Sequence, residues 1–260
     1  MNSFFSTYTI FFTLLIQLIG LTFASIVDPY IKKNHRIIIL INCVLTSMLI
    51  AQNYLDYSFS LEKSQYFYRT ITGIVGYSLR PVILVMWIYL IRRNQSLIIA
   101  WSLIIVNTMI HMTALFSNVC FTITPDNIFS RGPLGYSCHV ISGVLLLYLF
   151  WLSTDTYIES VNFGIDKNKS ASIPDVSNSV SSINMRQELK KYGYGLEALI
   201  PTFCVLVIIV SVVLDSKIYL ADQPIAFLTM AIVSCNLFYY LWLHLGFVRA
   251  YEEEKKAKEE

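Results

Sequence analysis

Apolar residues are gathered into seven long runs, and most polar residues fall between those runs. A helix needs ~20 apolar residues to cross about 30 Å of hydrocarbon, and each run comes close to that length. The pattern therefore predicts an all-α, polytopic bundle of seven membrane-spanning helices over residues 1–245. The predicted spans lie at about 8–27, 37–54, 70–91, 97–116, 135–153, 196–214 and 224–244.

Two polar segments lie outside the predicted spans. Residues 155–195 are the longest polar stretch, and they predict a loop that ends in a short amphipathic helix at 183–195. Residues 246–260 contain lysines four positions after glutamates and no proline. Such pairs stabilise an exposed helix, so we expect the last span to continue as a charged helical tail.

The composition is that of a membrane protein. Charged residues make up 14% of the chain, against about 25% in soluble domains, and hydrophobic residues make up 55%. The formal net charge is only +2, which gives no argument for a nucleic-acid partner. The lipid bilayer is the expected partner.

The positive residues predict an orientation, because they accumulate in the cytoplasmic loops of membrane proteins. With the N-terminus outside, fourteen of the nineteen fall in inner segments, four in outer segments, and Arg80 within a span. The fourteen are Lys32, Lys33, Arg36, Arg92, Arg93, Lys167, Lys169, Arg186, Lys190, Lys191, Arg249, Lys255, Lys256 and Lys258; the four are Lys63, Arg69, Arg131 and Lys217. We therefore expect the N-terminus outside and the C-terminus inside.

The third predicted span carries Arg80 near its middle, followed at once by Pro81. An arginine at that depth costs ~2.5–3.5 kcal/mol on insertion scales, so it usually faces protein or water. Asp56, at the outer end of the second span, is the expected counter-charge. Asp126 and Asp222 are weaker candidates.

Further polar residues fall in the outer half of the other spans: Gln52, Asp56, Asn107, His111 and His139. They admit two interpretations. With Arg80 they line a pocket for an anionic or carbonyl-bearing ligand, or they form interhelical hydrogen bonds worth ~0.6 kcal/mol each. Two histidines without a cysteine or carboxylate partner are a weak metal signal, so we expect no metal and no cofactor.

The remaining candidate chemistry is limited. Cys120 and Cys138 flank the outer loop 117–134, where an oxidising compartment permits a disulfide. Two free thiols are the alternative, because Cys138 falls at the start of the fifth span. The chain has no GxSxG, HExxH, Walker or GxGxxG motif, so we do not expect an enzyme.

Three stretches carry a resemblance to a known family: GYSLRPVILV (76–85), SRGPLGY (130–136) and LHLGFVRAYEE (243–253). They resemble the seven-helix membrane sensor region of Firmicutes-type histidine kinases and diguanylate cyclases. Tyr77, Arg80 and Pro81 match a Tyr-x-x-Arg-Pro pattern of that family. Arg131 begins a matching outer-loop stretch, and Phe247 begins a matching charged helix.

The resemblance implies a sensor in a bacterial plasma membrane. It would detect an extracellular or envelope signal and pass it through the last span to a cytoplasmic kinase or cyclase, or to a second copy of the chain. Members of the family continue into an output domain, and this sequence contains none, so we expect a stand-alone module or a shortened sensor. A small transporter or permease and a structural subunit of a membrane complex remain as alternatives. The ligand is not identified by the sequence.

Overall fold

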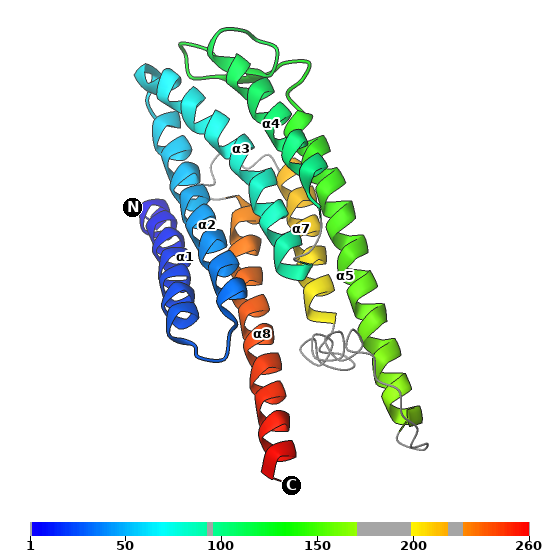
Figure 1. Cartoon of the computed structure of the whole chain (residues 1–260). Coiled ribbons are helices and arrows are strands. Elements are labelled where there is room, and N and C mark those ends of the chain that lie inside the picture. Colours follow the sequence, from blue (N-terminus) through cyan, green and yellow to red (C-terminus); the bar gives the residue numbers. More distant parts are fainter. Residues whose placement is uncertain (1, 93–95, 171–198, 218–225, 260) are drawn as a thin grey trace.

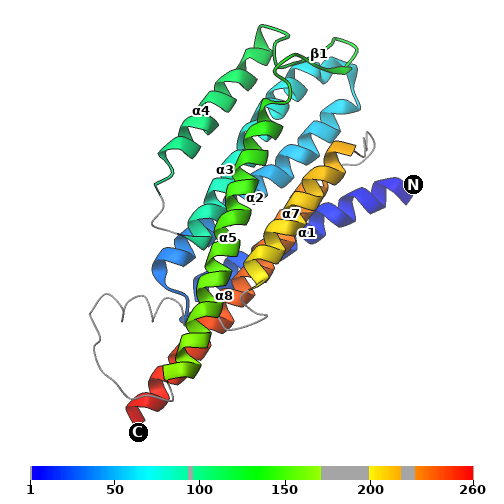
Figure 2. The same cartoon turned by 90° about the vertical axis from the view of Figure 1, so that its right-hand side faces the viewer.

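The computed structural model describes residues 2–92, 96–170, 199–217 and 226–259. Seven α-helices in these residues run in alternating directions, and α1 is steeply inclined to α5 and α8 (Figure 1, Figure 2). The helical content confirms the all-α prediction. The helices are α1 (Asn2–Val27), α2 (Lys33–Ser60), α3 (Tyr66–Ile91), α4 (Ile98–Met112), α5 (Ser137–Ser170), α7 (Ile200–Lys217) and α8 (Phe227–Glu259).

Six of the described helices are long and apolar enough to cross a membrane: α1, α2, α3, α4, α5 and α8. The apolar stretch of α7, Ile200–Asp215, is shorter than the other six. The span predicted at 196–214 is thus present as a helix over its described residues, but it does not reach the length of the others.

The two ends of the bundle differ (Figure 2). At one end a 3-10 turn, η1 (Lys63–Gln65), joins α2 to α3, and a second, η2 (Thr113–Leu115), follows α4. This end also carries a small antiparallel hairpin, β1 (Phe121–Ile123) with β2 (Phe129–Arg131). We call it the hairpin end, and we call the opposite end, where α8 finishes, the tail end. The sequence predicted turns here but no strands, because three-residue strands are too short to show an alternating pattern.

Helices α3 and α8 connect the two halves of the bundle. Helix α3 packs against α2, α4 and α5, whereas α8 packs against α1, α2 and α7. The two meet at Trp87 and Tyr239, whose ring centroids are 5.3 Å apart and which are almost fully buried. The Tyr239 hydroxyl donates to the Leu90 carbonyl at 2.8 Å. Carbonyls in the last turn of a helix lack helical donors, so Tyr239 also caps α3.

Buried polar side chains join α2 to α8. The Asn42 amide donates to Asn236 Oδ1 at 3.0 Å, and the Asn236 amide donates to Thr46 Oγ1 at 3.2 Å. Nearer the hairpin end, the Asn53 amide donates to Thr229 Oγ1 at 2.6 Å. These contacts fix the register of the two helices, as interhelical hydrogen bonds do in apolar surroundings.

Two helices extend well beyond the apolar bundle. Helices α5 and α8 have 34 and 33 residues, which corresponds to ~50 Å of helix. The helical tail predicted after Gly246 is confirmed as far as Glu259, with Lys258 Nζ 2.8 Å from Glu254 Oε1. The loop predicted from residue 155 is wrong as far as Ser170, because α5 continues to that residue. Extending an existing helix avoids a new nucleation step. The helix predicted at 183–195 lies outside the described residues.

Replacing Tyr239 with phenylalanine should lower the free energy of unfolding by about 1 kcal/mol, because a buried carbonyl loses its donor while the ring stays. Thermal unfolding in one detergent measures the effect. Tyr148→Phe is the matched control, since no hydrogen bond of its hydroxyl occurs among the described residues. Equal melting temperatures for the two variants would contradict the capping role.

Candidate functional site

The candidate site begins with a gap in the hydrogen bonds of α3. Pro81 lies inside this helix and has no N–H, so the carbonyl four residues earlier, that of Tyr77, loses its helical donor. Two other helices replace that donor. Asn107 Nδ2 on α4 donates to the Tyr77 carbonyl at 3.0 Å, and the Cys138 thiol on α5 donates to it at 3.2 Å. Proline thus creates the point at which α3, α4 and α5 are held together.

The side chain of Tyr77 is the centre of an aromatic and basic group. His111 stacks on its ring with centroids 4.8 Å apart, and Phe121 and His139 lie at 5.6 and 6.3 Å. The Arg80 guanidinium carbon lies 5.2 Å from the ring centroid, within cation–π range. We call Tyr77, Arg80, His111, Phe121 and His139 the Tyr77 cluster.

Several polar atoms in and beside the Tyr77 cluster are buried without a hydrogen-bond partner among the described residues. They are His111 Nε2, His139 Nδ1, Asn107 Oδ1 and Gln52 Oε1. His111 Nδ1 lies 2.8 Å from the Asn107 carbonyl, so it carries the proton and leaves Nε2 as an acceptor in the neutral ring. Buried polar groups are usually paired, which makes this concentration of unpaired atoms a candidate site for a polar ligand.

Gln52 reaches the site from α2 because Gly76 leaves room for it. A Cβ atom at Gly76 would lie 2.6 Å from Gln52 Oε1, so no larger residue fits without moving the amide. The structure therefore brings five of the predicted ligand-binding residues to one region: Arg80, Gln52, Asn107, His111 and His139. The sixth, Asp56, belongs to a different network.

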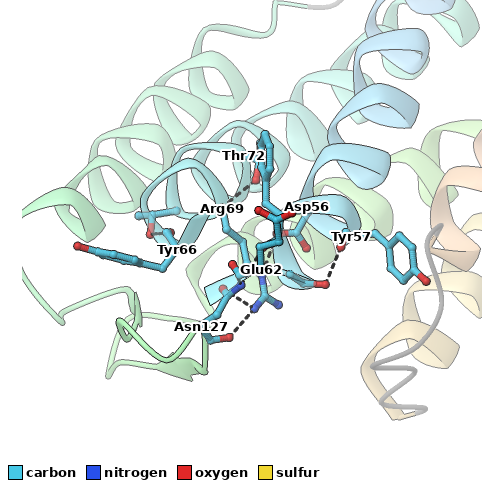
Figure 3. Close-up of polar contacts among 10 residues, drawn as sticks. Asp56, Tyr57, Glu62, Tyr66, Arg69, Thr72 and Asn127 are labelled. Carbon is cyan, nitrogen blue, oxygen red and sulfur yellow. Dashed lines mark hydrogen bonds and ion pairs between the residues drawn. The ribbon is translucent and has the colours of Figure 1, made fainter. Parts of the chain in front are cut away.

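Asp56 does not pair with Arg80. Its Oδ1 lies 3.4 Å from Arg69 Nε, so the predicted partner of Asp56 is corrected from Arg80 to Arg69 (Figure 3). Arg69 stands in the first turn of α3, whereas Arg80 lies about three turns further along the helix. No carboxylate among the described residues forms an ion pair with Arg80.

The same arginine also fastens the hairpin. Arg69 Nη1 donates to the Asn127 carbonyl at 2.8 Å and to Asn127 Oδ1 at 3.1 Å (Figure 3). The Asn127 amide in turn donates to the Phe59 and Glu62 carbonyls at 2.8 and 2.9 Å. Asn127 has φ of 64°, a left-handed conformation that asparagine tolerates better than most residues. We call Asp56, Arg69 and Asn127 the hairpin clamp.

The candidate disulfide is not formed. Cys120 and Cys138 are both buried free thiols. Cys138 lies in the first turn of α5 and turns its sulfur toward the Tyr77 carbonyl, and Cys120 Sγ lies 4.0 Å from the Leu134 carbonyl. Burial, and then the neighbouring Cys138, raise the pKa of Cys120 to about 11, so it stays protonated at neutral pH.

A second polar cluster lies at the tail end. Asp28 is buried, and it accepts the Tyr30 N–H at 2.9 Å, His244 Nδ1 at 2.6 Å and the Tyr240 hydroxyl at 3.1 Å. Burial alone would raise the pKa of Asp28, but these hydrogen bonds outweigh it and lower the pKa. Nearby, Phe247 packs edge-on against His35 with centroids 5.8 Å apart. We call Asp28, Tyr240 and His244 the tail clamp, because they tie α8 to the end of α1.

No family model, curated protein or solved structure matches this chain. The chemistry therefore rests on the geometry alone. The Tyr77 cluster offers a guanidinium, unpaired imidazole nitrogens and aromatic faces, which suit recognition of a polar or charged group.

Sequence reasoning missed the hairpin clamp and the tail clamp. Arg69 and Asp56 flank a short connection between neighbouring antiparallel helices. Their closeness in the sequence could have predicted that the two side chains pair. Asp28 stands just after α1 and His244 lies 216 positions later, so no local pattern relates them. Arg131, predicted from the resemblance alone, packs its guanidinium on Tyr136 with a carbon-to-centroid distance of 4.7 Å.

A double-mutant cycle tests the role of Pro81. Asn107→Leu should lower the free energy of unfolding by roughly 1 kcal/mol, because the Tyr77 carbonyl loses a donor. In a Pro81→Ala background a backbone N–H can bond to that carbonyl again, so the same change should cost less. Chemical denaturation of the four variants measures the coupling. An additive cycle would show that Asn107 acts independently of the proline.

The hairpin clamp can be tested at Asn127. Asn127→Gly removes the side-chain hydrogen bonds but accepts the positive φ, whereas Asn127→Ala also incurs ~1–2 kcal/mol of backbone strain. Alanine should therefore destabilise the chain more than glycine in thermal unfolding. The reverse order would mean that the left-handed conformation is not required.

Proposed function

We propose that the chain is a seven-helix membrane sensor whose hairpin end receives a signal and whose tail end transmits it. The observation that carries the proposal is the position of α3. One half of α3 holds Tyr77 and Arg80, and the other half packs on α8 through Trp87 and Tyr239. A single helix therefore contacts both the candidate binding cluster and the helix that leads to the tail.

The proposed orientation places the hairpin end outside and the tail end inside a bacterial plasma membrane. Most lysines and arginines belong to the segments at the tail end and to the tail itself, which is the distribution expected of cytoplasmic segments. In this arrangement α7 completes the seventh crossing despite its shorter apolar stretch. The Tyr77 cluster then lies in the outer half of the bilayer, within reach of an external signal.

The proposed output is a change in how α8 presents its charged tail. Helix α8 is continuous from the bundle core to Glu259, so a tilt or rotation at Tyr239 is carried along a stiff rod. The tail clamp holds this helix against the end of α1. In the proposed mechanism, this clamped position of α8 is one of the two states between which the helix moves. A ligand shifts such an equilibrium only by binding one position more tightly than the other. The receiver would be a kinase, a cyclase or a second copy of the chain.

Fusion of a dimerisation-dependent reporter to the C-terminus tests the function. Arg80→Gln should change reporter output by roughly five-fold or more, since allosteric couplings are typically 1–3 kcal/mol. Lys63→Gln is the matched control, because it removes one exposed charge at the same end of the bundle. A residue inserted after Tyr251 turns the tail by about 100° and should alter output, whereas a seven-residue insertion turns it by only ~20° and should preserve it.

Two results would contradict the sensor. The first is unchanged output in Arg80→Gln and in the one-residue insertion across a panel of external solutes. The second is solute uptake by proteoliposomes that contain only this chain, with no effect of the insertions. The latter result would favour a transporter, because uptake does not require a defined phase of the tail helix.

A further inference from the structure

The hairpin end contains two arginines that form no ion pair with a described carboxylate. Arg80 lies over the Tyr77 ring and Arg131 lies over the Tyr136 ring. The two rings approach His139 with centroid distances of 6.3 and 5.9 Å. Each arginine is thus connected to His139 through a neighbouring tyrosine ring, although the two arginines belong to different elements.

The described carboxylates at this end are engaged elsewhere. Asp56 pairs with Arg69 (Figure 3), and Asp126 pairs with Lys63 at 3.0 Å. Glu62 accepts a hydrogen bond from Gln65 at 2.9 Å. Asp215 on α7 accepts the Phe227 and Leu228 N–H groups of α8 at 2.8 and 3.0 Å. Arg80 and Arg131 thus have no ion-pair partner among these carboxylates, although Asp56 lies near enough to Arg80 to interact with it electrostatically.

The donors in this region suit an anion. A guanidinium stacked on an aromatic ring keeps the N–H groups of its edge available, and that edge matches a carboxylate or phosphate with two hydrogen bonds. His139 stands in the first turn of α5, where the helix dipole is positive and the first N–H groups have no helical acceptor. His111 is fully buried, and its Nε2 has no partner among the described residues, so it can accept a hydrogen bond from the O–H of a protonated phosphate.

We propose that Arg80, Arg131 and His139 bind one anionic oxygen group, a carboxylate or a phosphate, carried by a soluble ligand or by a lipid headgroup. The inference rests on the proposed function for what binding accomplishes, and it adds the chemical class of the signal. Arg131 acts from the hairpin and Arg80 from α3, so the anion joins the hairpin to the helix that contacts α8. The hairpin clamp keeps the hairpin in place for that contact.

Thermal unfolding in nanodiscs tests the site. In discs of phosphatidylcholine, inorganic phosphate or acetate should raise the melting temperature above that in chloride at equal ionic strength. Arg80→Gln and Arg131→Gln should each weaken this binding roughly ten-fold or more, because each removes a charge-assisted hydrogen-bond donor. Lys63→Gln, which removes an exposed charge from the same end, should bind as the natural chain does. Arg80→Lys keeps the positive charge but lacks the paired N–H donors of the guanidinium. It replaces Arg80→Gln if that variant does not fold.

A second arm separates the two sources of the anion. Discs that contain phosphatidylglycerol should stabilise the chain over phosphatidylcholine discs if the ligand is a lipid headgroup, and the gain should disappear in Arg80→Gln and Arg131→Gln. Stabilisation by the soluble probes alone assigns a soluble ligand. The proposal is overturned if no probe or lipid stabilises the natural chain, or if Lys63→Gln loses as much binding as the two arginine variants.

The failure of this inference can be distinguished from failure of the sensor. Anion binding that depends on Arg80 and Arg131, together with an unresponsive reporter, supports the site and contradicts the sensor. A reporter that responds to Arg80→Gln and to the phase of the tail, in a chain that binds none of the probes, supports the sensor and overturns the anion site.

Discussion

The missing N–H of Pro81 is the constraint on which the rest of the bundle depends. A backbone carbonyl left unpaired in apolar surroundings costs several kcal/mol, so α3 can hold a proline mid-helix only if other elements supply donors. Asn107 and Cys138 supply them, and in doing so they bring α4 and α5 to one turn of α3. The Tyr77 ring belongs to the residue whose carbonyl is freed. The aromatic cluster and the junction of three helices therefore have a common origin in one residue.

The charge of Arg80, next to that proline, is stabilised by a different interaction. An arginine inside a helical bundle is expensive unless it is paired or partly hydrated, and Arg80 has neither an ion pair nor a hydrogen bond among the described residues. It is half-buried, and it lies against the face of Tyr77, which supplies a cation–π contact of ~1 kcal/mol. Such a contact makes the charge tolerable without neutralising it. Asp56 is the nearest candidate to neutralise it, but the hairpin clamp pairs that carboxylate with Arg69, which lies about three turns before Arg80 in α3.

The parts of the structure that the sequence predicted are those that depend on local pattern. Apolar runs of about 20 residues predict helices because the solvent imposes their length, and the positions of Asn107, His111 and His139 along their helices follow from helical rise. Pairing of charges was predicted poorly because depth does not determine which arginine a carboxylate meets. Asp56 met Arg69 because a short turn brings the ends of α2 and α3 together. The helical extension of α5 was missed because polar residues can continue a helix that is already nucleated, so a polar composition does not mark where the helix ends.

Helix α8 is held at three levels, and this limits how it could move. Asp215 accepts its first N–H groups, Asn236 and Tyr239 fix it to α2 and α3 in the middle, and Asp28 holds it at the tail end. A helix with restraints at both ends and in the middle resists sliding along its axis, because sliding would break every contact at once. Rotation or tilt about the Trp87–Tyr239 contact changes fewer of them. Packed helices move between discrete arrangements rather than continuously, so a signal that reaches α3 would be carried to the tail as a change in the angle of α8.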